Sequence, residues 1–123
     1  MNKIIDIDFC TLKFYDNYML TIMKEGVHVD DFQNEMLIQI AEEFYKDKPF
    51  VYITYRINSY SVNPNIYATT SKMKSLAGFA VVCYDYKAKK NAQIEKLFLN
   101  KPFEIFCNLN EAFAWADKLI NKE

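Results

Sequence analysis

The stretch Phe50-Val51-Tyr52-Ile53-Thr54-Tyr55-Arg56-Ile57-Asn58-Ser59-Tyr60-Ser61-Val62-Asn63-Pro64 begins as a nearly continuous apolar run and ends in a polar loop before a proline. Such a run is typical of a parallel strand that helices cover on both faces. In open α/β sheets, ligands and partners bind at the carboxyl ends of such strands. The loop that follows this strand is therefore where we first expect a binding site.

On both sides of this stretch, apolar patterns predict strands that alternate with helices. Three strand patterns open the chain, and Asp16-Asn17 between the last two suits the positive φ of a two-residue hairpin. Strands are predicted over 4–9, 12–15, 18–24, 50–57, 76–84 and 103–106, and helices over about 31–45, 64–74, 85–99 and from 108 onward. This order favours an α/β fold with a mixed, mostly parallel sheet, right-handed crossovers and an antiparallel N-terminal hairpin.

Capping residues and apolar stripes support the four helices. The predicted N-terminal caps are Asp30 with Gln33, Asn63 before Pro64, Asp85, and Asn108 with Glu111. The predicted apolar positions are Phe32, Met36, Leu37, Ile40, Ala41 and Phe44 in the first helix, Ile66, Tyr67 and Met73 in the second, Ala88, Ala92, Ile94, Leu97 and Phe98 in the third, and Ala112, Phe113, Trp115, Ala116, Leu119 and Ile120 in the last.

Composition limits the class of protein. With 123 residues, 51% hydrophobic and 25% charged, we expect a single domain over residues 1–123 with its own core. The net charge of -1 provides no field that would attract nucleic acid, and no apolar run approaches the ~20 residues that span a bilayer. The chain becomes acidic at Asp6, where a secretion signal needs an apolar core, so we expect a cytoplasmic location.

The three cysteines, Cys10, Cys83 and Cys107, are far apart and form no CxxC pair. We therefore expect neither a disulfide framework nor a metal site, and we interpret each cysteine as a small buried side chain. His28 is the single histidine and has no companion at a metal-ligand or catalytic spacing, so we interpret it as a surface residue. No cofactor is expected, since two glycines cannot build a phosphate-binding loop.

The tail Lys101-Pro102-Phe103-Glu104-Ile105-Phe106-Cys107-Asn108-Leu109-Asn110-Glu111-Ala112-Phe113-Ala114-Trp115 resembles the closing strand and helix of SpoIIAA-like proteins. In those proteins a phenylalanine precedes a capped helix that carries Glu-Ala and an aromatic residue two or three positions later. They belong to the STAS superfamily of anti-sigma-factor antagonists, which is related in fold to the CRAL-TRIO lipid-binding domains. The order of elements matches over nearly the whole chain. The resemblance implies a SpoIIAA-like, STAS-type fold.

The best-known members of that superfamily are switched by phosphorylation of a Ser or Thr in the turn after the central strand. That turn typically reads Asp-Ser-Ser-Gly or close to it. The corresponding turn here, 57–64, contains Ser59 and Ser61 but lacks the Asp and the Gly, and it follows the positively charged Arg56. We therefore assign no kinase partner to this turn.

The candidate binding residues belong to two loops that should meet at the carboxyl edge of the sheet. They are Arg56, Asn58, Ser59, Tyr60, Ser61 and Asn63 in the first loop, and Tyr84, Asp85 and Tyr86 in the second. In one interpretation Arg56 binds an anion or a partner's carboxylate. In the other, Asn58 and Ser61 cap turns, Tyr60 packs, and Arg56 pairs with a nearby acid such as Asp85. Likewise, Lys87, Lys89 and Lys90 indicate either an acidic partner or a solvated face.

We expect a non-catalytic regulatory or protein-interaction domain, with exposed tyrosines as anchors for a partner. An edge strand that needs cover also suggests a homodimer. The alternative is a carrier of a small apolar ligand or lipid, with a cavity walled by Phe32, Met36, Phe44, Tyr67, Met73, Phe98 and Trp115. The third alternative is an enzyme that groups Arg56, Asp85 and His28 around one pocket.

Overall fold

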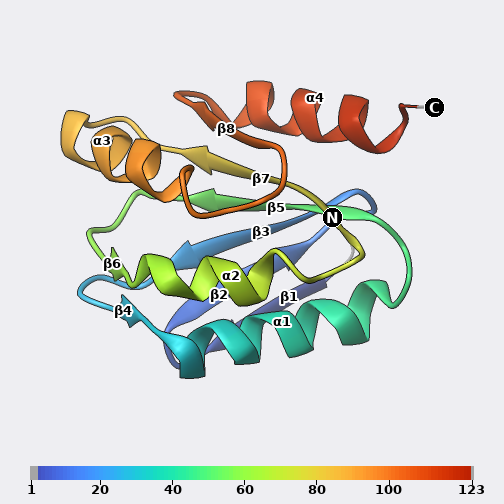
Figure 1. Ribbon diagram of the computed structural model, residues 1–123, viewed down its shortest axis with the longest axis horizontal. Coiled ribbons are helices and arrows are strands. Elements are labelled where there is room, and N and C mark those ends of the chain that lie inside the picture. Colours follow the sequence, from blue (N-terminus) through green and yellow to red (C-terminus); the bar gives the residue numbers. More distant parts are fainter. Residues whose placement is uncertain (1–2, 123) are drawn as a thin grey trace.

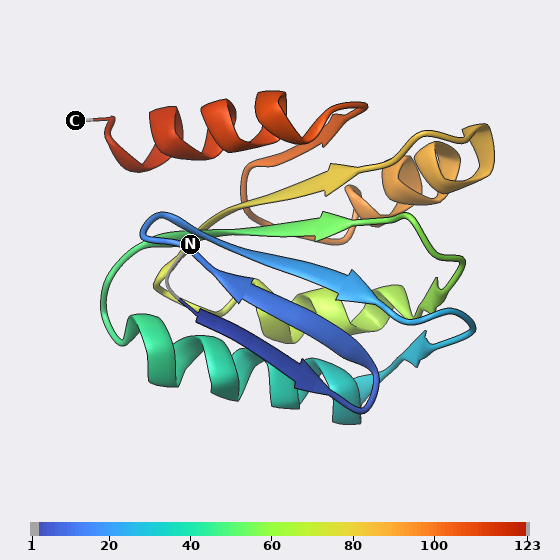
Figure 2. The ribbon, with the colours of Figure 1, turned by 180° about the vertical axis from the view of Figure 1, so that it is seen from behind.

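A six-stranded mixed sheet runs through the middle of the molecule (Figures 1 and 2). The computed structural model describes residues 3–122. The strand order is β1 (Lys3–Ile7), β2 (Cys10–Phe14), β3 (Tyr18–Met23), β5 (Phe50–Tyr55), β7 (Leu76–Val82) and β8 (Phe103–Phe106). The first three strands are antiparallel to their neighbours within that group, whereas β3, β5, β7 and β8 run parallel. The predicted mostly parallel sheet with an antiparallel N-terminal hairpin is confirmed.

Helices cover both faces of the central strands, as Figure 1 shows. On one face lie α1 (Asp31–Tyr45), the 3₁₀ turn η1 (Pro64–Ile66) and α2 (Tyr67–Thr70). On the other face, α4 (Leu109–Ile120) crosses β5 and β7. The helix α3 (Tyr86–Glu95) follows the carboxyl end of β7 and reaches the first of these two cores through Ala92. Figure 2 shows β1 and β2 at the sheet edge farthest from α4.

The alternation of β5 explains its nearly continuous apolar sequence. Phe50 packs in the core on the α1 side, whereas Val51 and Ile53 pack in the core beneath α4. All three side chains are buried. Because successive strand residues point to opposite faces, a strand covered on both sides is apolar at most positions, and the buried Thr54 is hydrogen-bonded to Tyr60. The prediction that the stretch from Phe50 forms a buried parallel strand is confirmed, with its last residue at Tyr55.

Close packing of α4 on β7 depends on Gly78. A Cβ atom at this position would lie 2.6 Å from Leu119 Cδ2 and 3.0 Å from Trp115 Cη2. Distances this short require a neighbour to move, so the missing side chain is what lets α4 approach the strand. The fully buried Ala112 and Ala116 form the inner face of α4 at this contact.

The four predicted capping residues are confirmed, although a reciprocal capping box is formed by Asp30 with Gln33 and not by Asn108 with Glu111. Asp30 forms the capping box with Gln33 at the start of α1. Asp85 Oδ1 accepts a hydrogen bond from Ala88 N at 2.7 Å, and Asn108 Oδ1 accepts one from Glu111 N at 3.1 Å. Asn63 Oδ1 accepts from Asn65 N at 3.1 Å, with Pro64 at the first helical position. Each cap satisfies a backbone donor that the first helical turn leaves unpaired.

Several boundaries differ from the prediction. The helix expected over 64–74 is reduced to η1 and the single turn α2, where the hydroxyls of Thr70 and Ser71 donate to the carbonyls of Ile66 and Tyr67. Such bonds compete with the regular helix. The third helix ends at Glu95, short of residue 99. The hairpin between β2 and β3 forms without positive φ at Asp16-Asn17, since among residues 3–122 only Gly26 and Lys46 have positive φ. Two short strands, β4 (His28–Val29) and β6 (Ser61–Val62), were not predicted.

The inner face of α1 is also rotated from its predicted position. Phe32 is 70% exposed and Met36 is 38% exposed, whereas Asn34, Leu37, Ala41 and Tyr45 are buried. Polar side chains can be buried on this face because they form hydrogen bonds within the protein. Tyr45 Oη, for example, donates to the carbonyl oxygens of Tyr15 and Tyr18. The predictions that Ile94, Leu97 and Phe98 are buried were wrong as well, since these residues lie on the outer side of α3 or just after it. No helix within residues 3–122 is long and apolar enough to cross a membrane.

Candidate functional site

A groove of about 530 Å³ opens at the carboxyl ends of β5 and β7. Three segments line it: the turn 25–27 after β3, the loop 56–64 after β5, and α3 from its cap Asp85 to Glu95. The two loops predicted to meet at this edge therefore do meet. Among the predicted residues, the groove is lined by Arg56, Asn58, Ser59, Tyr60, Ser61 and Asp85; Asn63, Tyr84 and Tyr86 lie outside its lining.

Arg56 forms a buried ion pair with Glu95 beneath the groove. Its Nη1 donates to Glu95 Oε2 at 2.9 Å and its Nη2 donates to Glu95 Oε1 at 2.5 Å. The side chains are only 7% and 8% exposed. Arg56 thus pairs with an acidic residue, as one of the two interpretations predicted, but Asp85 was the wrong partner, because Asp85 caps the first turn of α3 while Glu95 is buried on that helix.

Further hydrogen bonds connect this pair to the sheet and to α2. Tyr67 Oη donates to Glu95 Oε1 at 2.6 Å, and Arg56 Nε donates to Tyr60 Oη at 2.8 Å. Tyr60 Oη is also 2.8 Å from Thr54 Oγ1. Burial raises the pKa of Tyr67, and the neighbouring Glu95 raises it further. Burial alone would lower the pKa of Arg56, but the adjacent Tyr60 and Glu95 hold it well above its usual value. Arg56 and Glu95 therefore form a buried charge pair, and their hydrogen-bonding groups bond to each other and to neighbouring tyrosines.

The loop after β5 is held rigidly to the turn after β3. Asn58 Nδ2 donates to the Met23 carbonyl at 2.8 Å, and Ser59 N donates to Glu25 Oε1 at 3.0 Å. In return, Gly26 N donates to the Ser59 carbonyl at 2.7 Å, where the positive φ of Gly26 gives the turn its shape. Asn58 thus has a structural role, but it joins the loop to the end of β3 and does not cap a turn of its own loop as predicted.

The end of the same loop is joined to the start of α1. Strand β6 pairs with β4 in parallel, and His28 Nδ1 lies 2.7 Å from Ser61 Oγ. Asn63 Nδ2 donates to Asp30 Oδ1 at 3.0 Å. This hydrogen bond from Asn63 is the main reason that the pKa of Asp30 is lowered. His28 is exposed, as predicted, and unlike Arg56 and Asp85 it does not belong to the lining of the groove.

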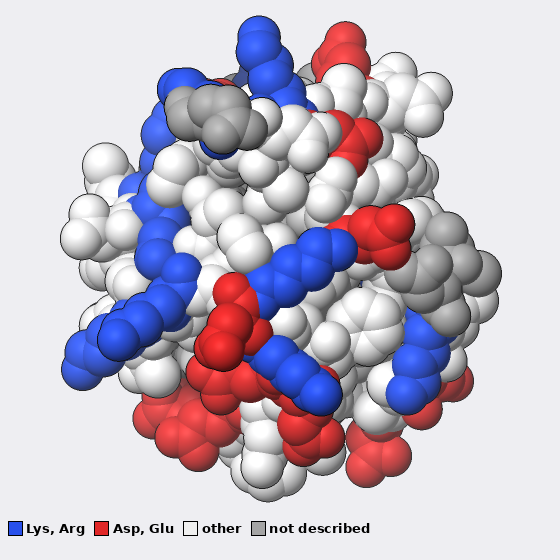
Figure 3. Space-filling model, turned by 90° about the vertical axis from the view of Figure 1, so that its right-hand side faces the viewer, with Lys and Arg blue, Asp and Glu red and all other residues white. Residues whose placement is uncertain are grey.

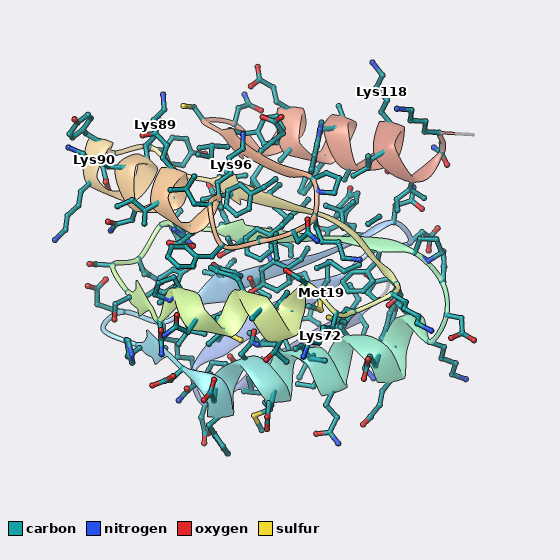
Figure 4. All side chains as sticks on the ribbon, in the orientation of Figure 1. Met19, Lys72, Lys89, Lys90, Lys96 and Lys118 are labelled. Carbon is teal, nitrogen blue, oxygen red and sulfur yellow. The ribbon has the colours of Figure 1, made fainter. Side chains whose placement is uncertain are left out.

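Several large apolar side chains are exposed in or next to the segments that line the groove, and one of them, Ile94, belongs to the lining. Tyr84 is 59% and Tyr86 is 76% exposed, and the Tyr84 hydroxyl lies 3.3 Å from that of Tyr55. The Lys90 Nζ lies 5.5 Å from the ring centroid of Tyr86. Ile57, Ile94, Leu97 and Phe98 are also exposed. Figure 4 shows Lys89 and Lys90 on α3 projecting outward from the molecule. The position of Lys90 over the Tyr86 ring allows a cation–π interaction at the surface of α3.

Glu95, Tyr67 and Thr54 belong to this site but were not predicted. The sequence does contain a signal for Glu95: Ala88, Ala92, Glu95 and Leu99 are spaced four, three and four residues apart, so the carboxylate falls within an otherwise apolar helical stripe. A charged residue in such a stripe needs a buried partner, since an unpaired buried charge is very costly.

A separate small cavity of about 40 Å³ lies between the sheet and the α1 side helices. Met19, which Figure 4 shows in the interior, lines it together with Tyr67 and Met73. Arg56 and Tyr60 border both this cavity and the groove. Of the predicted cavity walls, Phe32, Met36 and Phe98 are exposed, Phe44 packs on Phe14, and Trp115 packs on Phe106 under α4. These five do not line the cavity, because they lie on the surface or in packed contacts elsewhere.

The opposite end of the sheet carries a second hollow, of about 570 Å³. It is lined by Glu42, Lys46, Asp47, Pro49, Lys72, Lys74 and Ser75. Figure 3 shows lysines and acidic side chains intermixed over this end, so no field of a single sign marks it as a site. Within residues 3–122, no three His, Cys, Asp or Glu side chains are grouped so that they could hold a metal ion.

Comparison with known proteins identifies the fold. No protein-family model and no curated protein sequence matches the chain. A solved structure does match: an uncharacterized protein of the DUF3478 family from Shewanella loihica PV-4, described as having a SpoIIAA-like fold. The TM-score is 0.59 at 11% identity, over 87% of this chain and 91% of that chain. The chain therefore has a SpoIIAA-like fold, as the resemblance in its sequence implied.

Proposed function

We propose that the protein is a non-catalytic interaction domain that docks a partner protein at the groove between the loop 56–64 and α3. The observation that carries this proposal is the convergence of two strand-end loops on one groove whose surroundings expose Tyr84, Tyr86 and Ile94. Large aromatic side chains that a partner can bury are the usual source of binding energy in protein interfaces. A rigid loop beside them lowers the entropy that is lost on binding.

The charges of the groove support recognition over chemistry. Arg56 and Glu95 are paired with each other and almost completely buried, so neither is offered to a substrate. Asp85 is used as a helix cap. An enzyme needs an acid, base or nucleophile that can reach a bound substrate, and these groups are already bonded within the protein.

The partner surface that fits α3 is acidic. Lys87, Lys89 and Lys90 are exposed in the first turns of α3, and Lys87 lines the groove. Cations at this end of a helix are disfavoured by its dipole, so the helix itself gains nothing from them. Opposite charges on a partner would increase the rate of association and would make binding sensitive to salt.

Site-specific photo-crosslinking in the protein's own host would test this proposal. A photoreactive amino acid replaces Tyr86 in one version of the chain and Phe32 in the other, since both residues are exposed aromatics on helices. We expect one protein to be crosslinked through position 86 and not through position 32. Lys89→Glu with Lys90→Glu should lower its recovery at least ~10-fold, which corresponds to about 1.4 kcal/mol.

A matched control is Glu35→Lys with Glu42→Lys, which reverses two exposed charges on α1 and should leave recovery unchanged. Equal crosslinking from both positions, no specific product at position 86, or recovery that is indifferent to Lys89 and Lys90 would each contradict docking at α3.

A carrier of a small apolar ligand is the second candidate. Its support is the cavity between the helices and the sheet, which methionines 19, 23 and 73 line. Methionine side chains rearrange readily and could enlarge such a space. The present volume of about 40 Å³ suits water-sized molecules, whereas ligand pockets begin at ~300 Å³. Native mass spectrometry of protein from its own host, before and after denaturation, distinguishes the two candidates. A retained lipid would favour the carrier, and pairing of two copies would support the homodimer, which stays a prediction.

A further inference from the structure

Cys83 and Cys107 are the residues that directly follow β7 and β8. The last pair of the parallel ladder is Val82 with Phe106. Beyond it, Cys83 N donates a hydrogen bond to the Phe106 carbonyl at 3.0 Å. At the start of the same ladder, where Phe79 pairs with Phe103, Phe79 N donates to the carbonyl of the preceding Pro102 at 2.9 Å. The same bonding pattern places Cys107 opposite Cys83.

Extending the alternation of each strand by one residue places the two side chains on the same face of the sheet. Along a strand, side chains alternate between the faces, so residues four positions apart share a face. The rings of Phe79 and Phe103 stack at 5.1 Å on the side of α1 and α2. Cys83 and Cys107 each follow one of these phenylalanines by four residues. Neighbouring strands lie about 4.8 Å apart, which falls within the roughly 4.4–6.8 Å between Cα atoms that a disulfide joins.

The two thiols differ in exposure in a way that suits sequential chemistry. Cys107 is exposed, contrary to its predicted burial, since it follows β8, the strand at the edge of the sheet. Cys83 is 1% exposed, and burial is the main reason that its pKa is raised, while the charges of Arg56 and Cys107 also act on it. Cys10 is fully buried on β2, where burial raises its pKa to about 12. Oxidants in solution therefore reach Cys107 first.

We propose that Cys83 and Cys107 form a thiol pair that closes to a reversible disulfide when a peroxide oxidises Cys107. The Cys107 thiolate attacks one peroxide oxygen; an S–O bond forms, the O–O bond breaks, and the released hydroxide leaves as water. The Cys83 sulfur then attacks Cys107 Sγ, so that the S–S bond forms and the S–O bond breaks. The thiol proton and the sulfenic hydroxyl leave as a second water. Two thiols are oxidised and one peroxide is reduced to two waters.

The disulfide would link two points that control neighbouring helices. Cys83 lies two residues before Asp85, the cap of α3, and Cys107 lies one residue before Asn108, the cap of α4. A covalent bond just beyond β7 and β8 would fix the position at which α3 begins beside the groove. This consequence for docking rests on the proposed function, whereas formation of the disulfide does not.

Peptide mapping under non-reducing conditions tests the chemistry directly. The folded protein is treated with hydrogen peroxide, remaining thiols are alkylated in denaturant, and the chain is cut after Lys and Arg. The three cysteines fall in separate peptides, 4–13, 75–87 and 97–118, because the Lys101–Pro102 bond resists cleavage. We expect peptides 75–87 and 97–118 to be joined, lighter by two hydrogens than their sum. Cys10 should remain alkylated, and dithiothreitol should separate the pair.

Two variants sharpen the test. Cys10→Ser should leave the joined peptides unchanged, whereas Cys83→Ser should abolish them and leave Cys107 as sulfinic acid or joined to a second chain. In the unmodified protein, oxidation of Cys107 to sulfinic acid while Cys83 stays alkylated would overturn the proposal. Disulfides between Cys107 residues of two chains, with Cys83 still free, would also overturn it. None of these outcomes depends on a docking partner.

Discussion

The helices α3 and α4 both begin with an Asp or Asn cap after a parallel strand, but they are held to the sheet in different ways. Ala112 and Ala116 of α4 are fully buried, and the helix approaches β7 at Gly78. In α3 only Ala92 and Glu95 are buried, and Glu95 makes an ion pair. Apolar packing thus fixes α4, while directional bonds position α3. The helix beside the groove can therefore expose its tyrosine, isoleucine and lysines without losing its place.

The largest expected effect comes from removing the carboxylate that positions α3. Glu95→Ala leaves the guanidinium of Arg56 buried without its counter-charge and the Tyr67 hydroxyl without its acceptor. Breaking a buried pair in this way costs about 3–5 kcal/mol, a large part of the stability of a small domain. Urea unfolding followed by circular dichroism measures the loss.

The double variant Arg56→Met with Glu95→Leu serves as the control for this prediction. Replacing both partners with apolar side chains removes the unpaired charge, so we expect most of the lost stability to return. If Glu95→Ala costs less than about 1 kcal/mol, or the double variant is as unstable as the single one, the ion pair does not hold α3.

A smaller effect is expected where α4 meets the sheet. Gly78→Val places a side chain where even a Cβ would lie 2.6 Å from Leu119, so α4 must shift outward. Overpacking of this kind costs about 1–3 kcal/mol. The single tryptophan, Trp115, lies at this contact and should change its emission in the folded state. Unchanged emission and stability would show that α4 is packed less tightly than described.

The smallest effects distinguish the helices through their caps. Asp85→Ala and Asn108→Ala each remove an acceptor for a first-turn donor. Each should destabilise the first turn of its own helix by ~1 kcal/mol, about fivefold in the equilibrium between the closed and open turn. We expect Asn108→Ala to lower global stability, since α4 closes a core. Asp85→Ala should mainly accelerate amide hydrogen exchange in the first turn of α3. Equal, global losses from both variants would contradict the difference between the helices.

The sequence predicted the parts of the fold that depend on local patterns. Strand β5 is apolar at successive positions, and the caps Asp30, Asp85 and Asn108 carry their signal within four residues. The meeting of the loops after β5 and β7 followed from the general geometry of parallel sheets. These predictions needed no knowledge of which side chain touches which.

The predictions that failed depend on partners distant in the sequence. Arg56 and Glu95 are 39 residues apart, and Asp85 was the nearer acid in the expected loop. In α1 the apolar residues form two possible stripes on adjacent faces of the helix. The buried one includes Asn34, which is accepted because Thr70 Oγ1 donates to its Oδ1 at 3.2 Å. The spacing of residues along the chain does not reveal hydrogen bonds to distant segments, so it cannot show which of the two stripes is buried.

Arg56 and Tyr60 border both the groove and the small inner cavity, so these side chains separate the two spaces. Val62 lines both spaces as well, so a water molecule that passes between solvent and cavity by way of the groove must cross a partition of these three residues. The residence time of a water molecule in the cavity would then measure how often this partition opens. A partner seated in the groove should lengthen that time, which would make the interior of the domain a reporter of events on its surface.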